Sequence, residues 1–322
     1  MGGIKVMTVF GTRPEAIKMA PLVKELNRRD GIESIVCVTA QHREMLDQVL
    51  KIFDIIPDYD LDIMKPNQTL AEITSNILMK LDELIKNINP DIILVHGDTT
   101  TTYASAMAAF YNQIMVGHVE AGLRTNNKYS PFPEEMNRQL VSNIADMHFA
   151  PTQLAKQNLI NEGKCDSSIY VTGNTAIDAL KTTIVKNYES EITNKLKDNK
   201  LILLTAHRRE NLGENMENIF NAINKITSEF EDVEVVYPIH LNPKIREIAT
   251  KIFKDNSRMH LIEPLNVVDF HNLLNKAHIV MTDSGGIQEE APSLGKPVLV
   301  LRDSTERMEG IEAKTLKLAG VK

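Results

Sequence analysis

The chain has 322 residues, which is enough for two α/β domains of ordinary size. With 43% hydrophobic and 25% charged residues, its composition is that of a globular protein. The formal net charge of −7 argues against nucleic acid and anionic membranes as partners, but leaves room for a local basic pocket that binds a small anion. No apolar run reaches the roughly 18 residues that a membrane helix needs.

The amino terminus leads directly into a strand-like run with no signal-peptide pattern before it, so we expect a cytoplasmic protein. Cys37 lies in the apolar run "IVCVT", and Cys165 lies in the polar stretch "EGKCDSS". Their positions give neither a CxxC spacing nor an obvious pairing. We interpret both as reduced thiols, and Cys37 as a core residue.

Short apolar runs alternate with amphipathic stretches along the first half of the chain. The stretches 14–30, 43–53 and 70–88 have helical periodicity. Apolar strands separated by helices are typical of a parallel sheet covered on both faces. The predicted strands of this half are 4–11, 34–40, 91–97, 115–122, 147–152 and 169–173.

The polar segment from Tyr188 to Lys200 contains no strand, so we predict two domains, 1–188 and 189–322. The predicted fold class is α/β, with two doubly wound, Rossmann-like parallel sheets. Such tandem domains are expected to bind ligand in a cleft where the carboxyl ends of their strands face each other. The predicted strands of the second half are 201–208, 233–240, 260–264, 278–284 and 297–303.

The stretch "VEAGLRTNNKYSPFPEE", 119–135, carries carboxylates at both ends of one loop. Glu120 ends a strand, and Glu134 follows Pro133 at a predicted helix start. Each has a structural explanation as a cap or a surface charge. Together with Asp98, which ends the preceding strand, they also suit proton transfer on a bound substrate.

Three local pairings are expected around these carboxylates. Asp98 is placed to cap the helix that begins near Thr100 or Thr101. Arg138 lies four residues after Glu134 and is expected to pair with it. His118 precedes Glu120 on the same strand and is expected to orient it.

In "TDSGGIQEE", 282–290, a strand ends and a helix begins at Ser284-Gly285-Gly286. Free amide groups and the helix dipole at such a turn can bind a phosphate. A plain turn with Ser284 as the N-cap is the alternative. One of the two following glutamates, Glu290, is expected to accept hydrogen bonds from ribose hydroxyls, whereas Glu289 is expected on a solvated face.

The first strand-to-helix turn, "GTRPEAIKM", lacks the GxGxxG pattern, which makes a nicotinamide-dependent dehydrogenase an unfavoured interpretation. Arg13 and Lys18 are placed instead to clamp a diphosphate, with a surface Arg13–Glu15 pair as the alternative.

In the second half, His207 begins the basic run His207-Arg208-Arg209. His207 is expected to donate to a phosphate or to shuttle a proton, and a surface basic cluster is the alternative. Arg307 follows the last predicted strand and could reach the same phosphates.

The segment "PDYDLD", 57–62, contains two DxD triplets, a pattern that some metal-dependent sugar transferases use. We do not favour a metal site there, and no His or Cys spacing typical of zinc is present. The sequence therefore predicts an enzyme site without a metal or another cofactor.

Several blocks, among them "FGTRPEAIKMAPLV", "VHGDTTTT", "GHVEAGLRT", "YSPFPEEMNRQL", "TAHRREN" and "TDSGGIQEEAPSLGKPVLVLRD", resemble the bacterial non-hydrolysing UDP-N-acetylglucosamine 2-epimerases. The resemblance runs from about Lys5 to Leu318. It implies a GT-B fold, a homodimer, and reversible conversion of UDP-GlcNAc to UDP-ManNAc for envelope polysaccharides. It also implies elimination of UDP to a glycal and its re-addition. No metal or nicotinamide is implied.

Carried over block by block, the resemblance assigns roles to individual positions. It also implies a chain that continues past residue 322, so we expect the second domain to lack its final helices. Gln41 and His42 match a block that binds a second, activating UDP-GlcNAc in some family members. The catalytic group corresponds to Asp98, Glu120, Glu134 and His207, and the UDP contacts correspond to Arg13, Lys18, Phe270, Ser284, Gly285, Gly286, Glu290 and Arg307.

Two other functions fit the same residues. A GT-B glycosyltransferase would share the UDP-binding half and would transfer the sugar to an acceptor. A nucleotide-sugar-binding chain without catalytic activity would bind UDP and turn nothing over.

Overall fold

The computed structural model describes residues 3–40, 43–65, 68–196, 199–208, 211–305 and 307–321. These residues form two compact units, 1–179 and 180–322. The predicted domain boundary near Tyr188 falls within the second unit and stays a prediction.

Among the described residues, the first unit contains a seven-stranded parallel sheet of order β3-β2-β1-β4-β5-β6-β7. The strands are β1 (Ile4–Phe10), β2 (Ile32–Val38), β3 (Tyr59–Asp60), β4 (Ile92–His96), β5 (Met115–Val119), β6 (Met147–Ala150) and β7 (Ile169–Val171). The helices are α1 (Arg13–Arg28), α2 (Arg43–Ile52), α3 (Leu70–Ile88), α4 (Thr100–Tyr111), α5 (Glu134–Ile144), α6 (Gln153–Asn161) and α7 (Thr175–Thr183), the last ending in the second unit.

Helix α3 shows how the sequence specifies these elements. The Thr69 hydroxyl accepts a hydrogen bond from the amide of Glu72, and the Glu72 carboxylate accepts one from the amide of Thr69, so a capping box begins the helix. Asn89 ends the helix in the left-handed conformation. The apolar residues at a spacing of four, Ile73, Ile77, Leu81 and Ile85, are buried and belong to the same core as Met7, Val9, Ile93 and Val95 of the sheet.

The second unit contains, within its described part, a six-stranded parallel sheet of order β10-β9-β8-β11-β12-β13. The strands are β8 (Lys200–Thr205), β9 (Val233–Pro238), β10 (Met259–Ile262), β11 (Ile279–Thr282), β12 (Val298–Val300) and β13 (Leu316–Leu318). The helices are α8 (Glu191–Leu196), α9 (Glu214–Glu229), α10 (Pro243–Phe253), α11 (Val267–Lys276), α12 (Ile287–Ser293) and α13 (Met308–Glu312).

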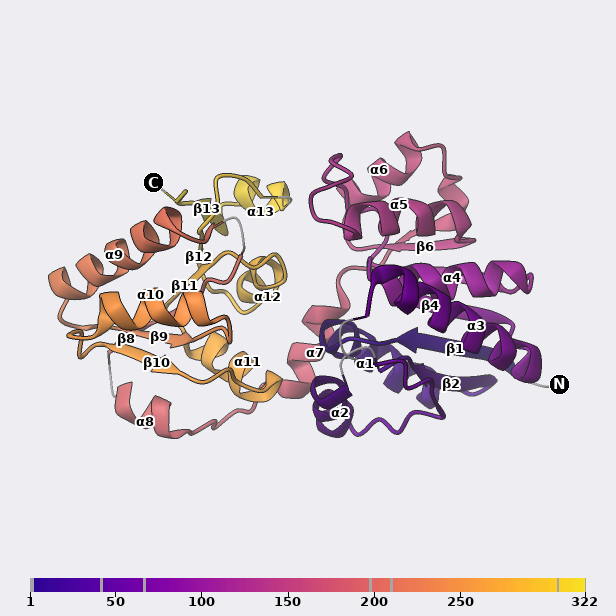
Figure 1. Ribbon diagram of the computed structural model, residues 1–322, viewed down its shortest axis with the longest axis horizontal. Helices are drawn as coiled ribbons and strands as arrows, with labels where there is room; N and C mark the ends of the chain where they lie inside the picture. The colour runs from indigo at the N-terminus through magenta and orange to yellow at the C-terminus, as the bar shows by residue number, and fades with distance from the viewer. Residues whose placement is uncertain are drawn as a thin grey trace. The chain divides into compact units, whose positions relative to one another are not determined.

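Alternate residues of β8 enter different cores, as expected for a strand buried on both faces. Ile202 and Leu204 belong to the core that includes residues of α9 and α10. Leu201 and Leu203 belong to the core that includes residues of α8, α11 and α12. Helices α9 and α8 accordingly lie on opposite sides of this sheet (Figure 1).

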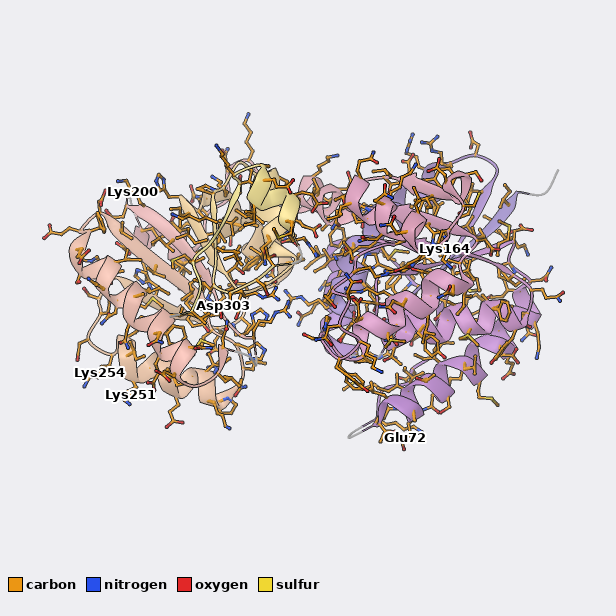
Figure 2. The ribbon with its side chains drawn as sticks, turned by 90° about the horizontal axis from the view of Figure 1, so that it is seen from above. Glu72, Lys164, Lys200, Lys251, Lys254 and Asp303 are labelled. Carbon is orange, nitrogen blue, oxygen red and sulfur yellow. The ribbon has the colours of Figure 1, made fainter. Side chains whose placement is uncertain are left out.

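The prediction of two doubly wound parallel α/β domains is confirmed. The short strands β3 and β13 were not predicted, because neither Tyr59–Asp60 nor Leu316–Leu318 stands out as an apolar run. Charged side chains such as those of Lys251 and Lys254 project from the surface of the second unit (Figure 2). No helix in the described part of the chain is both long enough and apolar enough to span a membrane.

Candidate active site

In the first unit, three of the predicted site residues follow adjacent strands. Arg13 begins α1 after β1, Asp98 follows β4, and Glu120 follows β5. The sheet order places these three strands side by side, and all of them are parallel. The side chains therefore share the carboxyl edge of one sheet, which is where doubly wound folds place their ligands.

Glu120 lies in a strained and crowded position. Its φ of 63° is in the left-handed region, which is uncommon for a residue other than glycine and which concentrates at functional sites. Its Oε2 accepts a hydrogen bond from Lys18 Nζ in a largely buried ion pair, and another from Asn174 Nδ2 at 3.3 Å. Lys18, predicted as a diphosphate contact, thus touches a predicted catalytic residue.

Two buried histidines lie behind this edge. His96 Nε2 is 3.8 Å from Glu120 Oε2, and burial lowers the pKa of His96 to about 4 although Glu120 opposes the shift. His118 contacts the main-chain oxygen of Gly97 at 2.7 Å, and burial lowers its pKa to about 3. His118 therefore anchors the turn before Asp98, and His96 is the histidine that neighbours Glu120. The hydrogen bond of His118 goes to Gly97, and the prediction that His118 orients Glu120 stays a prediction.

Asp98 is held by two residues of α5. Its carboxylate accepts a hydrogen bond from Arg138, and its main-chain oxygen accepts one from Asn137 Nδ2 at 2.9 Å. Arg138 thus pairs with Asp98, and within its own helix with Glu135, and not with Glu134 as predicted. Asp98 is not the cap of α4 either: Thr99 is the N-cap, and it accepts from the amide of Thr102.

The two neighbouring glutamates of α5 have different surroundings. Glu135 is fully buried and accepts hydrogen bonds from the amides of Thr125 and Asn126, from Arg138 and from Gln139, at 3.0 to 3.1 Å. It therefore holds the loop that leads from Glu120 to α5. Glu134 Oε2, in contrast, is buried and accepts no hydrogen bond from the described residues. A buried carboxylate oxygen left in this way is a candidate for contact with a ligand.

Glu15 holds the turn that carries Arg13. It is buried and accepts hydrogen bonds from the amides of Gly11 and Thr12, at 3.1 and 2.8 Å, and from Thr99 Oγ1 at 2.6 Å. Burial raises the pKa of Glu15 and lowers that of Arg13. Glu15 consequently ties the first strand-to-helix turn to the residue after Asp98, so it is not part of a surface pair.

In the second unit, His207, Ser284 and Arg307 follow β8, β11 and β12, which are again neighbouring parallel strands. The carboxylate of Asp283 links the first two strand ends, since its Oδ2 accepts from the amides of His207 and Arg208, both at 2.8 Å. The His207 and Ser284 strand ends are thereby tied together through a buried residue.

The turn Ser284-Gly285-Gly286 leads into α12, a helix of seven residues. Its N-cap is Gly286, so the interpretation of Ser284 as the cap was wrong. The Glu290 side chain folds back toward this turn: its Oε1 lies 3.7 Å from the position that a Cβ on Gly286 would take. Glu290 Oε2 also lies 3.6 Å from Nε2 of the buried His271.

Arg307 forms an ion pair with Glu289, and both side chains are mostly buried. The prediction that Glu289 lies on a solvated helix face was therefore wrong, because it balances the charge of Arg307. Phe270 is partly buried and packs against the core that contains Ile287 of α12. Phe270 and Glu290 thus belong to elements that share one core.

The DxD triplets are occupied by structural contacts. Asp58 accepts from the amide of Val36 at 2.8 Å, and Asp60 and Asp62 both pair with Arg43. Across the described ranges, no group of three His, Cys, Asp or Glu side chains is arranged to hold a metal ion.

The predicted activator site, Gln41 and His42, lies outside the described residues, and so does Arg209.

Sequence reasoning missed four side chains that contact the predicted site: His96, Asn174, His271 and Asp283. His96 and Asp283 could have been found from the sequence, because each lies at the end of a predicted strand that is followed by a predicted site residue. Asn174 had no such signal, because it reaches Glu120 from a segment distant in sequence. His271 directly follows the predicted UDP contact Phe270, but nothing in the sequence indicated that it lies beside Glu290.

The family model described as UDP-N-acetylglucosamine 2-epimerase matches residues 24–322. The UDP-N-acetylglucosamine 2-epimerase of Bacillus subtilis is 69% identical over 320 residues, which cover 99% of this chain and 84% of the relative.

Two of the similar solved structures contain bound ligands. The UDP-GlcNAc 2-epimerase of Neisseria meningitidis bound to UDP-GlcNAc has a TM-score of 0.91 and 52% identity, with 99% of this chain and 88% of that one covered. The Methanocaldococcus jannaschii UDP-GlcNAc 2-epimerase in complex with UDP-GlcNAc and UDP has a TM-score of 0.83 and 34% identity, with 98% and 89% covered.

Proposed function

The chain belongs to the UDP-N-acetylglucosamine 2-epimerase family, a family of isomerases with a two-domain GT-B-like α/β fold, and we propose that it interconverts UDP-GlcNAc and UDP-ManNAc. The observation that carries the proposal is the placement of three carboxylates. Asp98 and Glu120 follow neighbouring strands of one sheet, and Glu134 begins α5, the helix whose Arg138 bonds to Asp98. Two of these carboxylates are held by cations, and the third has a buried oxygen available for a ligand.

The chemistry explains why such a cluster is useful. Inverting C2 of the sugar requires a proton to leave one face of the ring and another to arrive on the opposite face. In the proposed route, the C2–H bond breaks as the C1–O bond to UDP breaks, which gives a glycal and free UDP. UDP then adds back at C1, and a proton is delivered to the other face of C2. Carboxylates suit both proton steps.

We assign the proton steps to Asp98, Glu120 and Glu134. Lys18 supports Glu120 directly, and its role as a diphosphate contact remains part of the proposal. Arg138 holds Asp98 in place, because it donates to Asp98 and to the buried Glu135 together. Such a bridge fixes a carboxylate in the position that proton transfer requires.

We assign UDP binding to Phe270, Ser284, Gly285, Gly286, Glu290 and Arg307, with Arg13 and His207 at the diphosphate. Glycines at the turn let a phosphate approach the main chain, and the cations stabilise the charge on departing UDP. Gln41 and His42 are proposed to bind an activating UDP-GlcNAc. A homodimer, a cytoplasmic location and a role in supplying envelope polysaccharides complete the proposal.

The decisive experiment follows the fate of the C2 proton. When the protein turns over UDP-GlcNAc in D₂O, we expect deuterium at C2 of the UDP-ManNAc formed, detected by NMR, because the proton passes through carboxylates that exchange with solvent. Added NAD should have no effect. Retention of the original hydrogen at C2 through many turnovers would refute the elimination route. Transfer of the sugar to an added acceptor, without UDP-ManNAc, would identify a glycosyltransferase instead.

Removing the Glu290 carboxylate should weaken UDP binding. We expect Glu290→Ala to cost about 1 to 3 kcal/mol, or roughly 5- to 150-fold in Kd, which is the scale of hydrogen bonds to a charged group. Titration calorimetry with UDP measures it. Glu231→Ala is the matched control, since Glu231 is exposed and precedes β9 at the opposite edge of the same sheet. Equal affinities for the two variants would remove Glu290 from the UDP site.

A further inference from the structure

Asp283 follows β11 and is fully buried. Its Oδ2 accepts hydrogen bonds from the amides of His207 and Arg208, both at 2.8 Å, and from Asn211 Nδ2 at 3.2 Å. The side chain cannot turn away without leaving those donors unsatisfied. One carboxylate oxygen therefore fixes both the turn after β8 and the orientation of the whole carboxylate.

The other oxygen, Oδ1, is buried and accepts no hydrogen bond within the part of the chain that is described. It lies 3.5 Å from Nδ1 of His207. A buried carboxylate oxygen favours a donor opposite it, and Nδ1–H of the imidazole can be that donor. Because a neutral imidazole carries only one N–H, a proton on Nδ1 leaves Nε2 free to accept.

Two other neighbours of His207 in the described part of the chain, His240 and Arg208, are basic. Its ring stacks on that of His240, with 5.6 Å between centroids. Desolvation lowers the pKa of His207, Asp283 opposes this shift, and His240 and Arg208 add to it. Asp283 is thus the acidic neighbour that favours the charged form of His207, against two basic groups that disfavour it.

We propose that Asp283 is a positioning residue that holds the Nδ1–H tautomer of His207 and directs Nε2 toward the ligand. When Nε2 takes up a proton, it can donate to a phosphate oxygen while Asp283 balances the charge at Nδ1. The inference rests on the proposed function for the contact between His207 and the diphosphate. The contacts from which the tautomer is inferred, those of His207 with Asp283 and His240, lie within the second unit.

Asp283→Asn separates this role from a purely structural one. The amide oxygen of asparagine can still accept from the two main-chain amides, so the turn after β8 is retained. Its NH₂ group then faces His207 Nδ1, which must become an acceptor and must leave the proton on Nε2. The substitution therefore reverses the tautomer while it preserves the turn.

The test uses the full chain with ¹⁵N-labelled histidine. In the native protein, two-bond ¹H–¹⁵N spectra should show neutral His207 protonated at Nδ1. In Asp283→Asn they should show it protonated at Nε2, with a lower pKa. Turnover of UDP-GlcNAc should fall about tenfold or more. Adding His207→Asn should cost no more than His207→Asn alone, because the two residues act as a unit.

The matched control is Asp255→Asn, another exchange of carboxylate for amide in the second unit. Asp255 has an 88% exposed side chain and follows Lys254 (Figure 2). This control should change neither the tautomer nor turnover. A native His207 protonated at Nε2 would overturn the inference without any variant, and so would an unchanged tautomer in Asp283→Asn. A native chain that turns over no UDP-GlcNAc would refute the proposed function, while the spectra would still decide the role of Asp283.

Discussion

Replacing Glu120 by glutamine should lower kcat for epimerisation by about 100-fold or more, the scale for losing a general acid or base. The amide keeps the shape of the side chain and can still accept from Asn174, so the change removes the proton-transfer function with little change in packing. Affinity for UDP should survive, because the proposed UDP contacts are dominated by the second unit. Steady-state kinetics and UDP titration on the same preparation measure both quantities.

The control for Glu120→Gln is Glu83→Gln, which makes the same exchange on the exposed face of α3. This variant should retain native kcat and native affinity. If Glu120→Gln also kept native kcat, Glu120 would be only the structural partner of Lys18. If it lost UDP affinity as much as kcat, the Lys18–Glu120 pair would serve substrate binding instead of proton transfer.

The positions of the candidate residues could be predicted because strand ends are visible in sequence. Apolar runs of four to seven residues identify β1, β4, β5, β8 and β11, and the polar residue after each one lies at the carboxyl edge. This reasoning places Asp98, Glu120 and His207 correctly relative to their strands, whatever their partners are.

The pairings of those residues could not be predicted by the same means. Arg138 seemed matched to Glu134 by helical spacing, but in the structure it bonds to Asp98 across the sheet edge. Glu289 seemed solvated, but it meets Arg307 from a segment 18 positions later. Spacing in the sequence predicts which residues are neighbours within one helix or strand. The partner of a buried charge often comes from a different element that packs against it, and spacing does not predict that element.

The two adjacent glutamates of α5 have different proposed roles, proton transfer for Glu134 and support of the loop for Glu135, and paired substitutions should separate them. Glu135→Ala should destabilise the first unit by about 3 kcal/mol, since it deprives the buried Arg138 of one partner and the amides of Thr125 and Asn126 of their acceptor. Amide exchange at Thr125 and Asn126 should accelerate, which hydrogen-exchange measurements on the full chain detect locally.

Glu134→Ala is the matched substitution, because the described residues donate no hydrogen bond to its buried Oε2. It should leave amide exchange at Thr125 and Asn126 unchanged and should lower kcat. Glu135→Ala should thus lower the stability of the loop, whereas Glu134→Ala should lower kcat and leave the loop intact. If Glu135→Ala left exchange in the loop at the native rate, the four hydrogen bonds to Glu135 would not be what holds the chain between Glu120 and α5.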